Sequence, residues 1–243
     1  MFRSHKWWSK SLGQDMEVRV YGHAGKPAIV FPSQEGRFFE YEDFGMVGVC
    51  APYLQAGKLR LITVDSVDGQ SWLNTSAHPR ARALRHNDYD RYIVDEVIPF
   101  VHGLAPGEGV MATGCSMGGY HSANLYFRHP DRFDSLIALS GVYRLNLFIG
   151  DYMDEHVYYH VPLAYLSGLE DPFYLEHYRQ GTIVVCVGQG AWEDAMVADT
   201  RALQKILEDK QVPARIDYWG YDVNHDWVWW RKMMPYFLDS FFS

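Results

Sequence analysis

A short apolar run at residues 109–113 leads directly into Gly-Cys-Ser-Met-Gly-Gly (residues 114–119), and a helical pattern follows at once. This order is typical of a serine held on a sharp turn between a strand and a helix, where small neighbours let the backbone pass close to adjacent strands. The hydroxyl of Ser116 would then lie at a helix N-terminus, whose partial positive charge favours a developing oxyanion. A chance glycine-rich turn is the alternative, and the flanking elements favour a nucleophile.

Short β-type runs alternate with helical stretches along most of the chain, which predicts a three-layer α/β fold with a mostly parallel central sheet. The expected strands are residues 17–21, 28–31, 59–65, 109–113, 136–139, 183–187 and 214–219, the first two forming a hairpin. The expected helices are residues 39–55, 87–102, a helix ending near residue 129, 195–210 and 226–242. The runs at 136–139 and 183–187 are almost unbroken apolar sequence, as in strands covered on both faces.

No repeat, low-complexity tract or linker divides the 243 residues, so residues 1–243 are expected to form one domain. Residues 141–181 do not fit the alternation and are crowded with aromatic rings. We interpret them as a short insertion between the sixth and seventh strands of the fold, which are the runs at 136–139 and 183–187. The insertion is expected to lie over the sheet edge where ligands bind. Either its rings form an apolar acyl or aromatic pocket, with Trp72 and Trp192 as the expected substrate-binding residues, or they only cover the sheet.

The charge balance excludes several kinds of partner. With 22 Lys+Arg against 30 Asp+Glu the net charge is −8, whereas nucleic acids and anionic membranes require a basic surface. No apolar run is long enough to span a bilayer, and the first ten residues lack the apolar core of a secretory signal. Three cysteines without a Cys-x-x-Cys pair indicate reduced, buried thiols, so a cytoplasmic location is expected.

A serine nucleophile needs a base, and position selects it among 11 histidines. On this kind of sheet the chain order is serine, then acid, then histidine. His225 lies in a polar loop after the last expected strand and just before the last expected helix. The other ten histidines lie before the expected acid or on the helix that follows the serine, so we predict that His225 is the base.

Two adjacent carboxylates compete for the role of the acid that orients this base. The loop after residues 183–187 reads Gly188-Gln-Gly-Ala-Trp-Glu193-Asp194. The spacing common in serine hydrolases selects Glu193, and Asp194 would then serve as the N-cap of the next helix. Glu193 is the favoured acid and Asp194 the fallback.

The oxyanion hole of such a site combines the N–H after the nucleophile, here that of Met117, with one from the loop after the strand at residues 28–31. Pro32 has no N–H to donate, so Ser33 or Gln34 must supply the second group. Gln34 is favoured by its spacing, and an ordinary turn is the alternative.

No metal or cofactor is predicted. His156 and His160 are four residues apart, as zinc ligands can be, but no acidic motif completes a site. The expected partner is a small-molecule ester substrate, with no nucleic acid and no membrane, and the sequence leaves a homo-oligomer open.

Three segments together resemble a known family. The segments are GCSMGG at residues 114–119, Gln-Gly-Ala-Trp-Glu at residues 189–193, and His225-Asp226-Trp227 with Trp230 behind it. They are similar to the esterase family of α/β-hydrolases, which includes esterase D (S-formylglutathione hydrolase), feruloyl and siderophore esterases and mycobacterial mycolyltransferases. The resemblance runs from about Glu17 to near the end of the chain.

The resemblance implies an α/β-hydrolase fold and a Ser–His–acid triad that hydrolyses or transfers acyl groups. Relatives of esterase D usually carry Asp where this chain has Glu193, and a Gly-Leu oxyanion turn where it has Ser33-Gln34. A serine carboxylesterase acting on small acyl or aromatic esters is the expected function. An acyltransferase or a thioesterase like S-formylglutathione hydrolase is the alternative, followed by a non-catalytic binding protein on the same fold.

Overall fold

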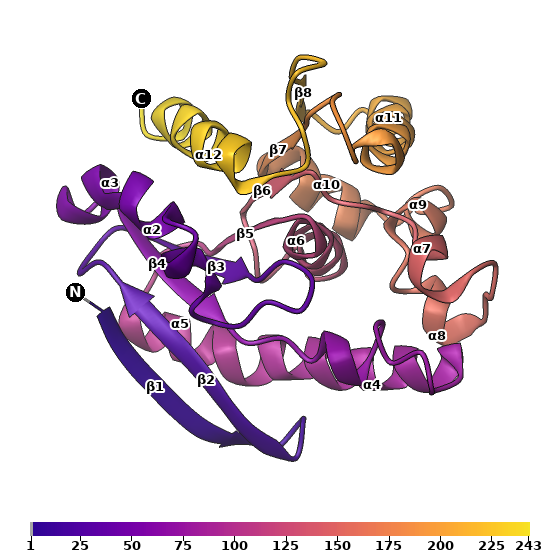
Figure 1. Ribbon diagram of the computed structural model, residues 1–243, viewed down its shortest axis with the longest axis horizontal. Helices are drawn as coiled ribbons and strands as arrows, with labels where there is room; N and C mark the ends of the chain where they lie inside the picture. Colours follow the sequence, from indigo (N-terminus) through magenta and orange to yellow (C-terminus); the bar gives the residue numbers. More distant parts are fainter. Residues whose placement is uncertain (1) are drawn as a thin grey trace.

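The computed structural model describes residues 2–243, in which eight strands form a sheet of order β1-β2-β4-β3-β5-β6-β7-β8 (Figure 1). The strands are β1 (Phe2–Ser9), β2 (Gln14–Tyr21), β3 (Lys26–Phe31), β4 (Leu59–Val64), β5 (Met111–Cys115), β6 (Ser135–Leu139), β7 (Thr182–Val187) and β8 (Arg215–Tyr218). Strand β2 is antiparallel to both β1 and β4, and all other neighbouring pairs are parallel. The predicted mostly parallel α/β sheet is confirmed.

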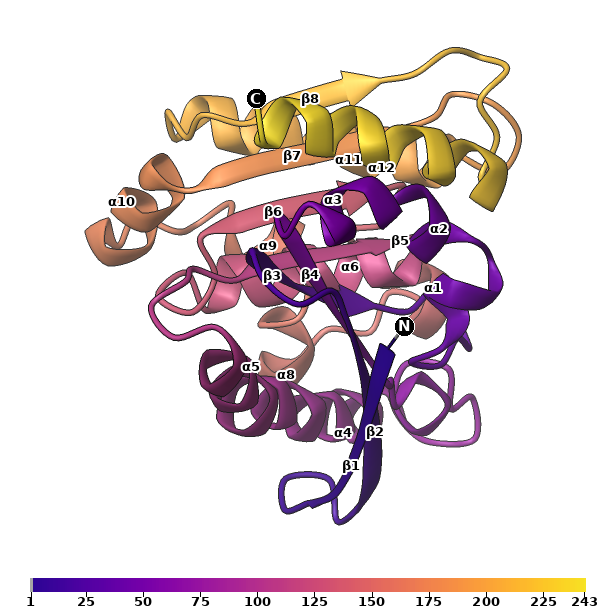
Figure 2. The same cartoon turned by 90° about the vertical axis from the view of Figure 1, so that its left-hand side faces the viewer.

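Helices cover both faces of the sheet and make three layers (Figures 1 and 2). On one face lie α1 (Glu40–Asp43), α2 (Met46–Val49), α3 (Ala51–Gln55) and α12 (Trp227–Phe241). On the other lie α4 (Pro79–Tyr92), the π-helical turn Ile93–Val97, α5 (Ile98–Leu104), α6 (Met117–Arg128), α10 (Pro172–Gln180) and α11 (Asp194–Asp209). Because side chains alternate along a strand, Ile29 and Phe31 of β3 enter one core while Ala28 and Val30 enter the other.

The segment between β6 and β7 forms four helices, and the first three of them lie together at one side of the molecule (Figure 1). They are α7 (Asn146–Ile149), α8 (Glu155–Tyr158), α9 (Pro162–Tyr165) and the longer α10. Val142, Leu145 and Val157 of this segment pack with Trp72 and Met117 in a third, smaller core. The insertion is therefore fastened to the start of α6, where Ser116 lies.

The predicted hairpin between residues 17–21 and 28–31 is wrong. Strand β2 pairs with β1 on one side and β4 on the other, and the hairpin is β1–β2, with Gly13 (φ +65°) in its turn. The turn signal after Tyr21 is real, but Gly22 and Gly25 (φ +86° and +88°) carry the chain past β4 instead of back along β2. A local turn signal does not specify the strand's partner.

Two predicted helices have different extents. Residues 39–55 form three short helices, and Gly45, at φ +75°, separates the first from the second. The helix expected at 87–102 begins earlier, at Pro79, where the His78 side chain accepts a hydrogen bond from the Arg80 N–H as N-cap. None of the described helices is both long enough and apolar enough to cross a membrane.

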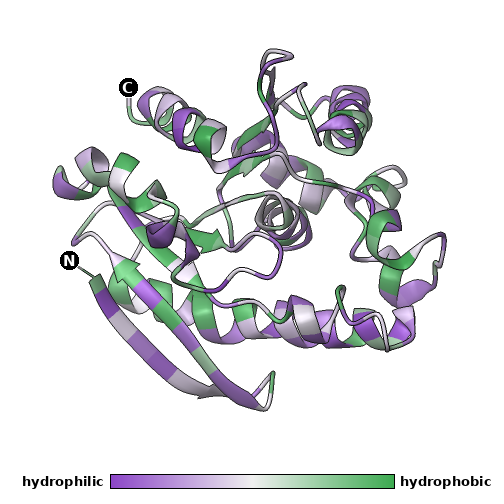
Figure 3. Ribbon diagram, viewed as in Figure 1, coloured by the Kyte–Doolittle hydropathy of each residue, from purple (hydrophilic) through white to green (hydrophobic). Residues whose placement is uncertain are grey.

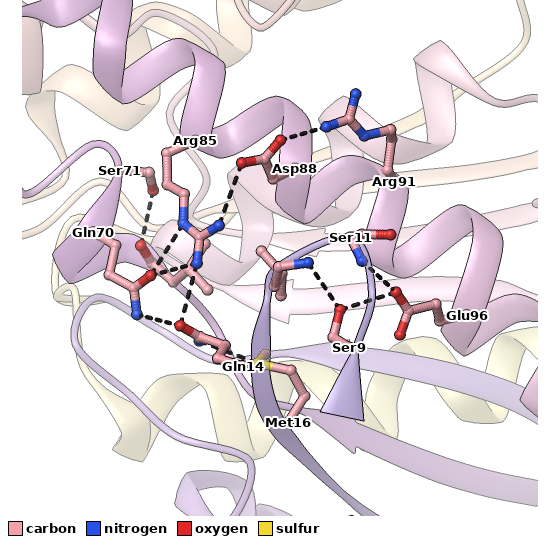
Figure 4. Close-up of polar contacts among 12 residues, drawn as sticks. Ser9, Ser11, Gln14, Met16, Gln70, Ser71, Arg85, Asp88, Arg91 and Glu96 are labelled. Atoms are coloured by element: carbon pink, nitrogen blue, oxygen red, sulfur yellow. Dashed lines mark hydrogen bonds and ion pairs between the residues drawn. The ribbon is translucent and has the colours of Figure 1, made fainter. Parts of the chain in front are cut away.

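Polar side chains fasten the β1–β2 hairpin to the helical layer beneath it (Figure 4). The Glu96 carboxylate, in the π-helical turn, accepts hydrogen bonds from the Ser9 hydroxyl and the Ser11 N–H at 2.9 Å each, and from the Trp7 indole at 2.9 Å. Arg85 of α4 donates to Gln14 in the hairpin at 3.2 Å. Strand β1 is mostly hydrophilic (Figure 3), and these contacts add to the packing of Leu12, Met16 and Val18 of the hairpin in the main core.

Glu96 should therefore stabilise the hairpin in a pH-dependent way. Burial alone would raise the pKa of its carboxyl, but the hydrogen bonds from Ser11, Trp7 and Ser9 outweigh burial and lower the pKa. A lowered folded-state pKa adds stability above the ordinary value of 4.5, and that stability is lost as the pH falls through the folded-state value. We expect Glu96→Gln to lower the free energy of unfolding by about 1–2 kcal/mol near neutral pH.

Denaturant unfolding at about pH 7 and at about pH 3 measures this contribution. The gap between wild type and Glu96→Gln should shrink at the lower pH. Asp95→Asn is the matched control, because Asp95 is exposed and its carboxylate has no hydrogen bond or ion pair with any residue in 2–243. A gap of equal size at both pH values would contradict the assignment.

Candidate active site

Ser116 lies on a strained turn between β5 and α6. Its φ of 57° and ψ of −121° belong to a region that residues other than glycine rarely occupy, so surrounding contacts must hold it there. The Ser116 N–H donates to the Leu139 carbonyl at 2.8 Å, and its own carbonyl accepts from the Tyr120 N–H at 3.1 Å. A side chain at Gly118 would lie 2.2 Å from the Phe31 carbonyl oxygen, so only glycine allows the turn to approach β3 this closely.

The structure brings together the three residues that the sequence singled out. His225 Nε2 lies 2.8 Å from Ser116 Oγ, and His225 Nδ1 lies 3.2 Å from Glu193 Oε2. Glu193 is fully buried, while the side chain of His225 is 15% exposed. One imidazole thus faces a hydroxyl on one nitrogen and a carboxylate on the other, the arrangement in which a histidine can accept a proton from an alcohol.

The loops that carry the acid and the histidine are joined by main-chain contacts. The Gly190 N–H donates to the Val223 carbonyl at 2.8 Å, and the His225 N–H donates to the Ala191 carbonyl at 3.0 Å. The Ala191 N–H donates to the Asn224 side chain at 2.8 Å. The separation of the imidazole from the carboxylate is therefore set by the backbone of both loops.

Asp194, the fallback acid, has no contact with His225 among the hydrogen bonds of residues 2–243 and is exposed. Its predicted role as N-cap is wrong, because Glu193 occupies the N-cap position and Asp194 is the first residue of α11. Trp192 adopts a left-handed φ of 68°, and the turn places Glu193 inside while Asp194 faces solvent. At the helix N-terminus its charge is still favourable to the helix dipole.

Ser140 was missed by sequence reasoning. Its hydroxyl donates to Glu193 Oε1 at 2.6 Å and accepts from the Trp230 indole N–H at 3.0 Å. The Trp230 ring also packs edge-to-face against His225, with centroids 4.9 Å apart. Ser140 follows β6 directly and has a φ of 50°, but a single serine after an apolar run carries no recognisable signal.

The two N–H groups expected in an oxyanion hole are both available. Neither the Met117 N–H nor the Gln34 N–H donates to a main-chain or side-chain acceptor in residues 2–243, and both residues line the cavity beside Ser116. The Ser33 N–H, by contrast, already donates to Glu40 Oε2 at 2.7 Å. Of the two alternatives that the sequence left, this geometry favours Gln34 over Ser33.

A cavity of about 490 Å³ opens beside the serine. Its lining is mostly apolar, and Glu35 is the carboxylate in it; the lining residues are Gln34, Glu35, Trp72, Leu73, Thr75, Ser116, Met117, Val142, Leu147, Phe148, Met196 and His225. Trp72, predicted to contact substrate, lies in this wall and is fully buried. Trp192 does not line the cavity and is 84% exposed, because its turn directs the side chain outward.

The two histidines considered as zinc ligands have separate surroundings. His160 is buried and contacts Asn87 and Arg128, whereas His156 lies beside Arg80. Within residues 2–243 no group of three or more His, Cys, Asp or Glu side chains is arranged to hold a metal ion.

The family model described as "Putative esterase" matches residues 9–238. No curated protein matches the chain. Similar solved structures include a ferulic acid esterase, with 15% identity, 96% of this chain and 95% of that chain covered, and a TM-score of 0.75. The S-formylglutathione hydrolase FrmB of Staphylococcus aureus has 18% identity, the same coverage and a TM-score of 0.67. Mycobacterium tuberculosis MPT51 has 15% identity, again the same coverage, and a TM-score of 0.69. At such identities the likeness shows a shared α/β-hydrolase fold.

The Ser140 contacts generate a prediction about stability. Ser140→Ala leaves a buried carboxylate oxygen of Glu193 and the buried indole N–H of Trp230 without their partner. We expect this change to lower the free energy of unfolding by about 1–3 kcal/mol, measured by urea denaturation. Ser122→Ala is the matched control, because that buried hydroxyl bonds only a carbonyl of its own helix and should cost less. Equal losses in the two variants would contradict the role given to Ser140.

Proposed function

Because the chain belongs to the esterase family of α/β-hydrolases, we propose that it is a serine carboxylesterase that hydrolyses small acyl or aromatic esters through Ser116, His225 and Glu193. The observation that carries the proposal is the 2.8 Å contact between Ser116 Oγ and His225 Nε2 at the edge of an open cavity. A nucleophile, its base and an orienting acid are the minimum that acyl transfer to serine requires.

In the proposed acylation step, His225 Nε2 takes the Ser116 proton as Oγ attacks the ester carbonyl. The carbonyl oxygen becomes an oxyanion that accepts hydrogen bonds from the N–H groups of Met117 and Gln34. Collapse of this intermediate breaks the bond to the leaving alcohol, which receives the proton from His225. Glu193 holds the imidazole in one tautomer and stabilises its positive charge.

In the deacylation step, water replaces the alcohol. His225 takes a proton from the water, the resulting hydroxide attacks the acyl-enzyme carbonyl, and Ser116 leaves with the proton returned by His225. The products are a carboxylic acid and the free serine.

The cavity supports the substrate class. Its apolar wall, with Trp72, Phe148 and Leu147, suits a small aliphatic or aromatic acyl group. The alternative is a thioesterase or an acyltransferase that uses the same three residues, as the name of the S-formylglutathione hydrolase neighbour suggests. Product analysis with competing alcohols and thiols distinguishes these. We also propose a cytoplasmic location, supported by three buried, free cysteines that suit a reducing compartment.

Ser116→Ala tests the nucleophile. We expect this variant to lose p-nitrophenyl acetate hydrolysis by at least roughly a thousandfold, because no other group can form the acyl-enzyme. Its thermal unfolding midpoint should not fall, because the change removes one hydroxyl without opening a large cavity. Activity retained in a folded Ser116→Ala variant would refute the proposal.

A matched pair of neighbouring substitutions tests the acid. Glu193→Gln should lower kcat by roughly 100- to 10,000-fold, because an amide cannot stabilise the imidazolium and can favour the wrong tautomer. Asp194→Asn should leave kcat within about threefold, since its side chain faces solvent. Steady-state kinetics measure kcat for both variants. A large loss of kcat in Asp194→Asn with little loss in Glu193→Gln would instead assign Asp194 as the acid.

A further inference from the structure

A buried carboxylate lies beside the proposed oxyanion hole and takes no part in the proton transfer. Glu40, the first residue of α1, accepts two hydrogen bonds from one residue: the Ser33 N–H at 2.7 Å and the Ser33 hydroxyl at 2.5 Å. Ser33 directly precedes Gln34, whose N–H faces no acceptor within residues 2–243.

The buried surroundings of the Glu40 carboxyl make it unfavourable for the stability of the fold. The residue is 7% exposed, and no Lys, Arg or His in residues 2–243 forms an ion pair with it. Burial raises the pKa of its carboxyl, and the Ser33 hydrogen bonds only partly offset this. A buried carboxyl that has hydrogen-bond donors but no cationic partner is unfavourable for folding, so a functional reason is expected for it.

The turn that Glu40 contacts is itself strained. The Gly36 N–H donates to the Ser33 carbonyl at 2.9 Å, which closes a β-turn, and Glu35 within it adopts a φ of 61°. A Cβ at position 36 would lie 2.3 Å from a Glu40 carboxylate oxygen, so the carboxylate packs directly on the turn's backbone. Without contacts that hold it, a turn with a non-glycine residue at positive φ would relax.

The far end of the same loop is also fastened. Arg37 donates to both carboxylate oxygens of Asp65, at 2.6 and 2.9 Å, and the Phe38 N–H donates to Asp65 at 3.3 Å. The segment from Ser33 to Phe38 is thus held at its start by Glu40 and at its end by Asp65. Gln34 lies next to the Glu40 attachment, on the cavity side.

We propose that Glu40 is a positioning residue: it holds the turn at residues 33–36 so that the Gln34 N–H stays directed at the oxyanion of the reaction. This inference rests on the proposed function, because an oxyanion forms only if Ser116 attacks a carbonyl. Oxyanion stabilisation depends on donors that are already oriented before charge develops, and a donor on an unsupported turn loses that advantage. Glu40 therefore acts through Gln34, without touching substrate.

Three substitutions distinguish a positioning role of Glu40 from a purely structural one. Glu40→Ala removes both contacts to Ser33 and should lower kcat by about 100-fold with little change in KM, because the ground-state ester does not need the oxyanion donors. Glu40→Gln keeps both contacts, with its amide donating to the Ser33 hydroxyl, and should retain kcat within about fivefold. Ser33→Ala loses one contact and should fall between them, by about tenfold.

A transition-state analogue supplies a readout that a purely structural role would not move. A trifluoromethyl ketone adds to Ser116 and forms an oxyanion, whereas the corresponding methyl ketone fills the cavity largely without one. Glu40→Ala should weaken inhibition by the trifluoromethyl ketone in proportion to its loss of kcat/KM and leave methyl ketone binding unchanged. Glu42→Ala is the matched control: Glu42 lies on the same helix but bonds Arg19 and Tyr21, so trifluoromethyl ketone affinity should stay at the wild-type value.

The outcomes are distinguishable from failure of the proposed function. If wild type hydrolyses esters through Ser116 but Glu40→Ala and Ser33→Ala keep full kcat and full trifluoromethyl ketone affinity, the positioning role is wrong and the esterase stands. If Glu40→Ala does not fold, the kcat and the trifluoromethyl ketone affinity of Ser33→Ala decide in the same way. If wild type shows no hydrolysis that depends on Ser116, both proposals are overturned.

Discussion

The hydrogen bond between Ser116 Oγ and His225 Nε2 joins residues 109 positions apart. The sheet, the turn at Ser116 and the loop that carries His225 together bring the two side chains into contact. The serine contacts the imidazole from a strained backbone, with φ at 57°. That strain is held by β5 before it, α6 after it and the close approach of Gly118 to the end of β3. The parallel sheet brings the ends of β5, β7 and β8 to one edge, from which the three side chains emerge on separate loops.

The polar groups behind this contact are buried and hydrogen-bonded, so they restrict the orientation of the His225 imidazole. Trp230, Ser140 and Glu193 form a chain of hydrogen bonds that ends at His225. Beside the proposed oxyanion hole, Glu40 makes an analogous pairing with Ser33. Both buried carboxylates accept a hydrogen bond from a serine hydroxyl, and neither has an Arg or Lys partner in residues 2–243. A buried acid paired with neutral groups costs stability, which is a common feature of sites selected for function.

The sequence predicted the parallel sheet, the insertion and the three residues that converge, because strand–helix alternation and a glycine-rich turn are local patterns. It did not predict that β2 pairs with β4, because turn residues such as Gly22 do not specify a partner. Ser140 and Glu40 were also missed: each matters only through a residue distant in the chain or buried beside it. Trp192 was predicted to contact substrate, but it lies outside the cavity wall, because a positive φ, which sequence does not reveal for tryptophan, turns its side chain to solvent.

The proposed function requires that Ser116 is a nucleophile activated by His225. Peptide mapping by mass spectrometry after reaction with a fluorophosphonate tests it most directly, because the adduct on an activated serine is stable and its position can be read. We expect a single phosphonyl group on Ser116 in the wild-type protein and strongly slowed labelling in His225→Ala. Labelling of another residue, or equally fast labelling of Ser116 in His225→Ala, would contradict it.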